Sequence, residues 1–556
     1  MNGGAWYRDP LVLTALGIAL ALRLAFWDTL GLDHFDEGGY AMTAGAVAEG
    51  LFGTSRYPLQ HFLSPPFQFG TAGLLMWSLG LADQALVLVS LSLGTATVLL
   101  VFLVARRWFG RPAGIAAMSL IGLADFHILY SRSGLTDVAF TFWFLLALAL
   151  FAELATRCSW KWILAAGFAT ALAWNTKYHG WLAVVIASGA LVAGLLHHPV
   201  REQWRIGKGV LAAAVLAFAL YLPWLLFVNQ QPGGYARLTA EHASYLNPTN
   251  AIAHLRSHFA SQLYLDGWWG RLAPGVAALV IGIGSAGSWT RHRAYRVSLV
   301  ALCGILLGNS LFVGVAALAV LPHALRERSR GVHVAITFFL AFSALTPLYT
   351  PYPRLALPWL VAGAVLGGAG LARFIGTQEP IATPHSSLSR LRYAAALGML
   401  LITTLAVIQR PPWESASTFR PKDGFRRAAA EIVGHVPTGA AVVVWGEPAV
   451  VFYLRQRLPN VVHVDNLNRL DEYAGDDGVA YLVTSIYADR IGGAWSFDAW
   501  KERHPGGERT LVTVPVRDIS DVRLLDDGPP SNARLFLTGD MGTYDLRLHA
   551  MRVIDP

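Results

Sequence analysis

Two adjacent carboxylates, Asp36 and Glu37, follow the first long apolar run of the chain. A membrane-spanning helix needs neither, and ionisable groups at membrane depth usually face a cavity and a partner. Neighbouring carboxylates tend to raise each other's pKa, which suits a general base. The same acids would stabilise the N-terminus of a helix beginning at Gly38 or Gly39. The two roles are compatible, and the pair is the first candidate for chemistry.

Other polar side chains fall, with this pair, in outer loops or near outer helix ends of the topology derived below. The candidates are the ionisable groups His61, Asp125, His127, Arg132, Asp137, Lys177, His179, Arg256 and Arg354. Arginine and lysine hold a phosphate through charge-assisted hydrogen bonds, while a carboxylate can deprotonate an acceptor hydroxyl. A transporter of an anionic solute would use the same side chains. The residue types alone leave both alternatives open.

The composition identifies a polytopic membrane protein, because 54% of the 556 residues are hydrophobic and only 14% are charged. Residues 1–410 hold 27 Lys and Arg against 15 Asp and Glu, whereas residues 411–556 hold 16 against 20. The net charge of +8 therefore reflects membrane topology, and no nucleic-acid partner is expected. Cys158 and Cys303 lie far apart and imply no disulfide framework.

A bilayer core of about 30 Å requires about 20 helical residues. The apolar runs give thirteen candidate spans: 10–27, 84–104, 112–129, 136–155, 161–175, 180–196, 209–228, 273–287, 297–308, 310–322, 332–346, 354–371 and 393–408. With the N-terminus inside, the inner loops hold 18 of the 27 basic residues, as the positive-inside rule requires. The boundary in "LLGNSLF" is the weakest, since merging those two spans would change the parity.

Two outer segments, 28–83 and 229–271, are too long to be turns. In the first, "GGYAMTAGAVAEGLF" and "PPFQFGTAGLLMWSLG" predict helices that lie in the membrane interface. Residue 411 begins short β-branched runs, such as "AAVVVW", "VVHV" and "VAYLVTS", between turns and two helical stretches. The sequence thus predicts a membrane domain over 1–410 and a soluble α/β domain over 411–556 on the outer side.

The order of these features resembles the GT-C glycosyltransferases, most closely the protein-mannosyltransferase-like and aminoarabinose-transferase-like branch, glycosyltransferase families 39 and 83. The resemblance covers residues 1–410 and rests on the acidic pair after the first span, the interfacial helices, "SRSGLTD", "NTKYHG", "LPW" and "TPLYTPYPRLALPW". It implies a GT-C fold with about thirteen transmembrane helices. The C-terminal domain resembles that of the family only in its position after the membrane domain, and not in its sequence.

The resemblance also implies transfer of a sugar, with inversion, from a polyprenyl-phosphate donor to a lipid, glycan or protein acceptor. The site would lie on the outer face of a bacterial cytoplasmic membrane. Asp36 carries over as the base with Glu37 beside it. Asp137 would orient the acceptor or Arg132, and Lys177 would approach the donor phosphate. Arg354 with Tyr349 and Tyr352 would close over that phosphate.

The sequence departs from the family pattern at "HFLSPPF", where Ser64 replaces the His or Lys that precedes Pro-Pro in many relatives. The nearest imidazole is His61. Either His61 takes the role of that residue from a different position, or other groups hold the donor phosphate. The sequence requires no cofactor; the fold can hold a divalent ion, but nothing here indicates one. The alternatives are a transporter or flippase, which would favour an internal repeat of spans, and a non-catalytic membrane scaffold.

Overall fold

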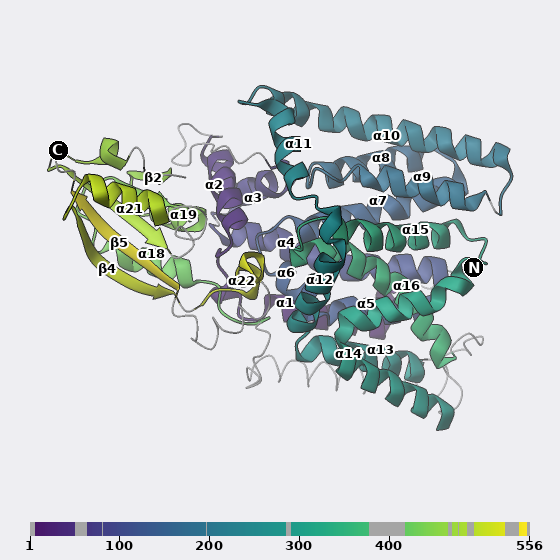
Figure 1. Ribbon diagram of the computed structural model, residues 1–556. Coiled ribbons are helices and arrows are strands. Elements are labelled where there is room, and N and C mark those ends of the chain that lie inside the picture. Colours follow the sequence, from purple (N-terminus) through teal and green to yellow (C-terminus); the bar gives the residue numbers. More distant parts are fainter. Residues whose placement is uncertain are drawn as a thin grey trace.

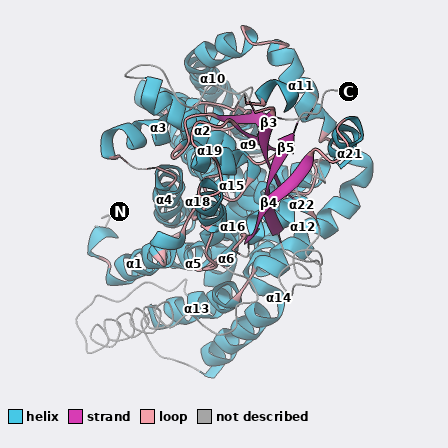
Figure 2. Ribbon diagram, turned by 90° about the vertical axis from the view of Figure 1, so that its left-hand side faces the viewer, coloured by secondary structure: helices cyan, strands magenta, loops and turns pink. Residues whose placement is uncertain are grey.

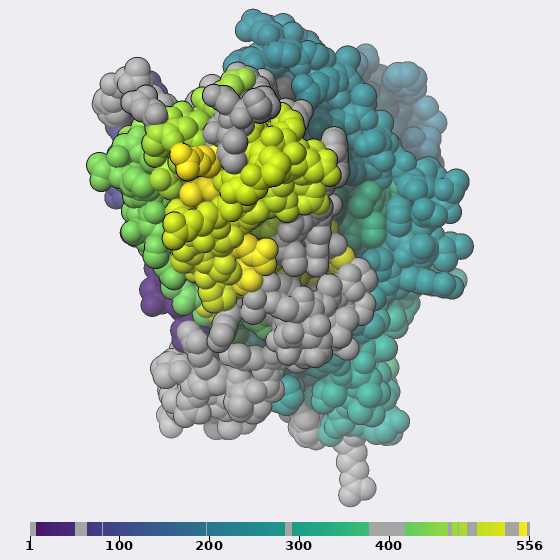
Figure 3. All heavy atoms as spheres, turned by 60° about the vertical axis from the view of Figure 1, so that its left-hand side comes forward, coloured from purple at the N-terminus to yellow at the C-terminus, as the bar shows by residue number. Residues whose placement is uncertain are grey.

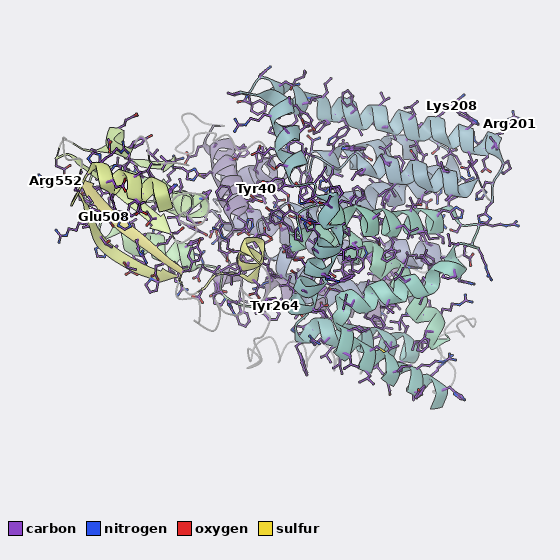
Figure 4. The ribbon with its side chains drawn as sticks, in the orientation of Figure 1. Tyr40, Arg201, Lys208, Tyr264, Glu508 and Arg552 are labelled. Carbon is purple, nitrogen blue, oxygen red and sulfur yellow. The ribbon has the colours of Figure 1, made fainter. Side chains whose placement is uncertain are left out.

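The computed structural model describes residues 6–50, 64–80, 82–195, 197–284, 291–376, 418–464, 467, 470–475, 477–485, 494–516, 518–528 and 544–552. A bundle of helices carries a small sheet at one end (Figure 1). The N-terminus lies at the opposite end of the bundle, and so do Arg201 and Lys208 of the predicted inner segment "REQWRIGK" (Figures 1 and 4). This arrangement fits the charge asymmetry of the sequence.

Six described helices or helical segments are long and apolar enough to cross a membrane, and a bent pair of helices is a broken span or a re-entrant loop. The six lie in α4 (Gln84–Phe109), α7 (Asp137–Arg157), α10 (Val200–Asn229), α14 (Arg291–Ala324), α15 (Arg330–Leu345) and α16 (Leu357–Ile375). Shorter apolar helices pack beside them: α1 (Pro10–Leu24), α8 (Trp160–Trp174), α9 (Leu182–Gly194) and α13 (Trp268–Gly284). On α10 the apolar Leu211 and Val215 are more than 60% exposed, as expected of a helix edge that faces lipid. The prediction of a polytopic membrane protein is confirmed, whereas the count of thirteen spans is not.

Two spans differ in shape from the prediction. The predicted span 112–129 is broken into α5 (Arg111–Gly122) and α6 (Asp125–Ser131), which meet at 63°. The predicted boundary in "LLGNSLF" coincides with a break inside α14, where Gly308 takes a φ of +71°. The two halves of α14 pack on different helices: Gly304 lies against Pro274 of α13, and Val313 lies against Gly363 of α16.

The long outer segments form helices between the bundle and the sheet. α2 (Phe35–Gly50) and α3 (Phe67–Leu79) correspond to the two predicted interfacial helices, and Figure 1 shows both between the spans and the sheet. The second segment contains α11 (Gly234–Ser244) and α12 (Ala251–Leu265). Acidic residues at 36 and 37 do occupy the first turn of α2.

The C-terminal part is built on a five-stranded mixed sheet in the order β2-β1-β3-β5-β4. The strands are β1 (Val442–Trp445), β2 (Val461–Val464), β3 (Val479–Ser485), β4 (Glu508–Val516) and β5 (Tyr544–Arg552). The helices are α18 (Gly424–Val433), α19 (Pro448–Arg455), α21 (Ala494–Arg503) and α22 (Asp521–Asp527). The predicted α/β class is confirmed. Figure 2 looks onto this end, with the sheet in front of the bundle, and Figure 3 shows the green-to-yellow residues as one mass against the teal helices.

The C-terminal part is fixed directly to α2. A Cβ at Gly38 would lie 2.1 Å from the backbone nitrogen of Ala449, so only glycine allows α19 this approach. Beside this contact, Lys422 Nζ lies 3.0 Å from Glu37 Oε1 and 3.6 Å from Asp33 Oδ1. Asp33 in turn accepts hydrogen bonds from the backbone N–H and hydroxyl of Ser520, which precedes α22. The predicted domain boundary at residue 410, the predicted span 393–408 and His61 lie outside the described residues.

Candidate active site

A cavity of about 1400 Å³ lies where α2, the segment after α8, α10, α11 and the loop before α16 meet the C-terminal part. Tyr40 of α2 borders this cavity, and Figure 4 shows it between the spans and the sheet. The polar wall includes Asp36, Lys177, Arg354 and Asp526. The cavity thus collects charged groups from segments as far apart as α2 and α22.

Arg354 joins two carboxylates at the centre of the polar wall. Its Nη1 donates to Asp36 Oδ2 at 2.8 Å, and its Nη2 lies 3.4 Å from Asp526 Oδ2. His34 completes the group, because its Nδ1 accepts the backbone N–H of Asp36 at 3.1 Å. The remaining proton therefore sits on Nε2, 2.7 Å from Asp526 Oδ2. One cation and one imidazole hold two acids in fixed positions.

Asp36 is held in its ionised form. Burial would raise the pKa of its carboxyl, but the charge and hydrogen bond of Arg354, with a smaller contribution from Lys177, outweigh that influence and keep the pKa below the ordinary value. The side chain is 25% exposed and borders the cavity. An ionised carboxylate at a cavity wall can accept a proton from a bound hydroxyl.

The Glu37 carboxylate has different hydrogen-bond partners from that of Asp36. Its Oε2 accepts the backbone N–H groups of Asp33 and His34, and its Oε1 accepts Gly134 N–H at 2.6 Å and Lys422 Nζ at 3.0 Å. Four donors therefore saturate this buried carboxylate, which does not border the cavity. Burial would raise the pKa of Glu37, whereas the charge of Lys422 and the backbone N–H groups of Asp33 and His34 lower it. The geometry suits a positioning residue for the start of α2, and the prediction of a catalytic role stays untested.

Lys177 borders the cavity and makes an ion pair with Asp137, Nζ to Oδ1 at 2.6 Å. Asp137 opens α7 and is almost fully buried behind the lysine. Next to them, burial and then Lys177 lower the pKa of His179 to about 3, so this cavity imidazole is neutral. The pair presents a cation to the cavity, as predicted for a phosphate contact. Asp137 orients that cation.

Arg132 does not border the cavity. Its Nη1 donates to the backbone carbonyls of Arg23 at 2.9 Å and of Ala25, and its guanidinium lies 5.4 Å from the centre of the Phe419 ring. A cation at these carbonyls satisfies the C-terminus of α1, whose last acceptors lack partners within the helix. The position gives no support to the prediction that Arg132 binds substrate. The same prediction for His61 falls outside the described residues.

The predicted tyrosines do reach the cavity. Tyr349 and Tyr352 border it together with Tyr245 of the second outer segment. The Tyr245 ring lies 5.6 Å from that of Tyr349 and 6.2 Å from that of Tyr352, and the Arg354 guanidinium lies 5.2 Å from the Tyr352 ring. Burial raises the pKa of Tyr352 to about 12, so its hydroxyl stays protonated as a hydrogen-bond donor.

Sequence reasoning missed the groups that the C-terminal part supplies: Asp526, Arg523, Trp445 and Gly446 border the cavity. It also missed His34, two residues before the acidic pair. The "DHFDE" spacing contained a signal, since a histidine beside an acid pair is a candidate partner; nothing in "DVRLLDD" pointed to the site. Across the described residues, no group of three or more His, Cys, Asp or Glu has the geometry to hold a metal ion.

Solved structures with the same architecture show to which fold class the chain belongs. ArnT from Cupriavidus metallidurans bound to undecaprenyl phosphate has a TM-score of 0.57 and 16% identity, with 97% of each chain covered. The Archaeoglobus fulgidus oligosaccharyltransferase in complex with Zn and sulfate has a TM-score of 0.54 and 15% identity, over 90% of this chain and 71% of that chain. The chain therefore has the GT-C fold, a polytopic helical bundle followed by a C-terminal part.

Within that class, a sequence model of the family described as dolichyl-phosphate-mannose-protein mannosyltransferase matches residues 80–234. This range runs from the end of α3 to the start of α11 and includes Asp137 and Lys177. No curated protein sequence matches the chain. The resemblance predicted from the sequence is confirmed: both the fold and the matched family belong to the GT-C glycosyltransferases.

Proposed function

We propose that the protein is an inverting glycosyltransferase that moves a sugar from a polyprenyl-phosphate donor to a lipid, glycan or protein acceptor. The site would act on the outer face of a bacterial cytoplasmic membrane, with the N-terminus in the cytoplasm. Residues 1–410 would form the membrane domain, and residues 411–556 would form a soluble domain on the outer side. The family match and the undecaprenyl phosphate bound to ArnT support this donor class.

The observation that carries the proposal is the ionised Asp36 beside two cations in one cavity. Arg354 bonds Asp36 directly, and Lys177 borders the same space. Cations of this kind stabilise a departing phosphate, which gains charge as its bond to the sugar breaks. A base and an anion site in one cavity are what a direct displacement at a sugar phosphate requires.

The proposed step balances as a single displacement. The acceptor oxygen forms a bond to the anomeric carbon while the bond between that carbon and the phosphate oxygen breaks. The electron pair leaves with the polyprenyl phosphate, which Lys177 and Arg354 bind. The acceptor proton passes to Asp36. Attack from the face opposite the leaving group inverts the anomeric carbon.

The apolar wall of the cavity suits the prenyl chain of such a donor. The side chains of Leu182, Trp224, Phe227 and Leu345 border it, and Leu345, the last residue of α15, is 41% exposed. Apolar side chains that continue from a polar site to the lipid-facing surface allow a lipid tail to stay in the membrane while its phosphate enters the site. Membrane lipids would be the surrounding partners.

A transporter or flippase and a non-catalytic scaffold are disfavoured. The matched family and the similar solved structures are glycosyltransferases. In addition, Asp36 is ionised and borders the cavity. A scaffold would have no need of that arrangement.

The test is sugar transfer by the full-length protein in membranes supplied with radiolabelled polyprenyl-phosphate sugars. Labelled product with an inverted anomeric centre is expected, and membranes without the protein are the control. Failure to transfer from a panel of such donors would favour the transporter or the scaffold.

A further inference from the structure

The C-terminal part contributes a carboxylate to the cavity wall, that of Asp526 in α22. Its Oδ2 lies 2.7 Å from His34 Nε2 and 3.4 Å from Arg354 Nη2. His34 and Arg354 both contact Asp36, because His34 Nδ1 accepts the backbone N–H of Asp36 and Arg354 Nη1 donates to Asp36 Oδ2. Asp526 therefore contacts both of these partners of the proposed base.

The two carboxylate contacts of Arg354 fix the orientation of its guanidinium. This group is planar and its N–H donors point in fixed directions. One nitrogen on Asp36 and another on Asp526 therefore determine the plane of the group. The Tyr352 ring, 5.2 Å from the guanidinium, lies beside it. Without Asp526, the guanidinium could turn about its contact with Asp36.

The contact with His34 fixes the orientation of an imidazole. Because Nδ1 accepts a hydrogen bond from the backbone of Asp36, the hydrogen-bond pattern assigns the proton to Nε2, and Asp526 Oδ2 accepts it. The side chains of His34 and Asp526 are only 6% and 7% exposed, so the bond is shielded from competing water. Loss of this carboxylate would remove the acceptor of Nε2–H, and the ring could turn away from the first turn of α2.

From this geometry we propose that Asp526 is a positioning residue for sugar transfer, which orients His34 and Arg354 and, through them, the carboxylate of Asp36. The inference rests on the proposed function and goes beyond it, because it makes the C-terminal part a component of the active site. The role requires no contact between Asp526 and a substrate. A base must lie within hydrogen-bond reach of the acceptor proton, and a misplacement of about 1 Å can lower a rate about a hundredfold.

Contacts that do not involve Asp526 hold α22 in place. Asp33 accepts both the N–H and the hydroxyl of Ser520, which precedes the helix. Tyr264 of α12, labelled in Figure 4, donates to Asp521 Oδ1 at 3.3 Å. Both contacts join α22 to residues far earlier in the chain. A substitution of Asp526 should therefore leave the helix where it is and remove only the contacts with His34 and Arg354.

The test measures kcat of sugar transfer, per amount of folded full-length protein, for Asp526→Ala. This variant should lose about ten- to a hundredfold in kcat, and the loss should persist at saturating donor and acceptor, because the base is misplaced in the fully bound complex. Asp526→Asn should lose less than about fivefold, since its amide oxygen can accept from His34 and Arg354 in the place of Oδ2. Asp498→Ala, at an exposed ion pair on α21, is the matched control and should equal wild type.

A double-mutant cycle tests whether Asp526 acts through Arg354. If it does, Asp526→Ala adds little once Arg354 is replaced by glutamine. The loss of kcat in the double variant should then be smaller than the product of the two single losses by a factor of at least about three. Two independent structural effects would simply multiply.

An unchanged kcat in Asp526→Ala would overturn the inference while wild-type transfer still upheld the proposed function. So would a loss that disappears at saturating substrates, an Asp526→Asn variant as impaired as Asp526→Ala, or single losses that multiply in the double variant. Absence of transfer by wild type would instead refute the proposed function.

Discussion

Replacing Arg354 by glutamine should move the acid limb of the pH–rate profile to higher pH. Arg354 Nη1 lies 2.8 Å from Asp36 Oδ2, which puts the two charge centres about 4 Å apart. At an effective dielectric constant of about 20 the pair is worth about 4 kcal/mol, and the partial exposure of Asp36 reduces this toward 2 kcal/mol. Since 1.4 kcal/mol is a factor of ten, loss of Arg354 weakens the preference for the ionised carboxylate about 30-fold or more.

The direction follows from the groups that remain. Burial is the largest single influence on Asp36, and without Arg354 it is no longer outweighed, so the pKa rises and less of the base is ionised in mild acid. The assay is kcat/KM for sugar transfer between pH 5 and pH 8. The ratio of the rates at pH 5 and pH 8 should fall below that of wild type, by up to about threefold for a 30-fold weakening.

Arg237→Gln is the control for this experiment, because it removes a cation from the same cavity and leaves the ion pair of Asp36 intact. It can lower the rate, but its acid limb should coincide with that of wild type. An Arg354→Gln profile with an unmoved acid limb would refute either the pairing or the assignment of Asp36 as the base.

Three further predictions concern stability. Lys422→Met leaves two buried carboxylates without their cation and should cost about 3–5 kcal/mol in unfolding experiments, whereas the exposed Lys501→Met should cost less than about 1 kcal/mol; equal costs would contradict the buried cluster. Gly38→Ala should lower the Tm by several degrees because its Cβ meets the α19 backbone, while Gly50→Ala, with open space around it, should not; similar Tm values would argue against that close contact. Burial raises the pKa of Asp266 to about 6, so the folded state retains a proton that the unfolded state releases, and wild-type stability should fall as the pH rises from 4 through 6. Asp266→Asn should remove that loss, worth up to about 3 kcal/mol at pH 7.5; an unchanged pH dependence would show that Asp266 does not titrate in this way.

Much of the site was predictable because membrane topology sorts residues before any fold is known. Asp36, Lys177, Tyr349, Tyr352 and Arg354 fall on one side by the positive-inside rule, and all five border the cavity. Hydropathy likewise located most spans. Hydropathy depends on composition alone and carries no information on the direction of a helix axis. It therefore could not show the 63° bend between α5 and α6.

The parts that sequence reasoning missed depend on long-range contacts without a local signature. His34 and Asp526 are 492 positions apart, and neither stands in a motif that predicts the other. Asp36 and Glu37 have different partners because of the orientation of α2 about its own axis. Asp36 faces the cavity and Arg354, whereas Glu37 faces Lys422. The runs predicted as strands did not include β5, although its polar and apolar residues alternate as in a half-buried strand.

The most direct test of the central claim is the rate of labelled sugar transfer by Asp36→Asn at the same amount of folded protein as wild type. Asparagine keeps the size of the side chain and can still bond Arg354 through its oxygen, but it cannot take up the acceptor proton. The account predicts a rate lower by about two to four orders of magnitude, with binding of sugar-free polyprenyl phosphate retained. Transfer at the wild-type rate would contradict the assignment of Asp36 as the base.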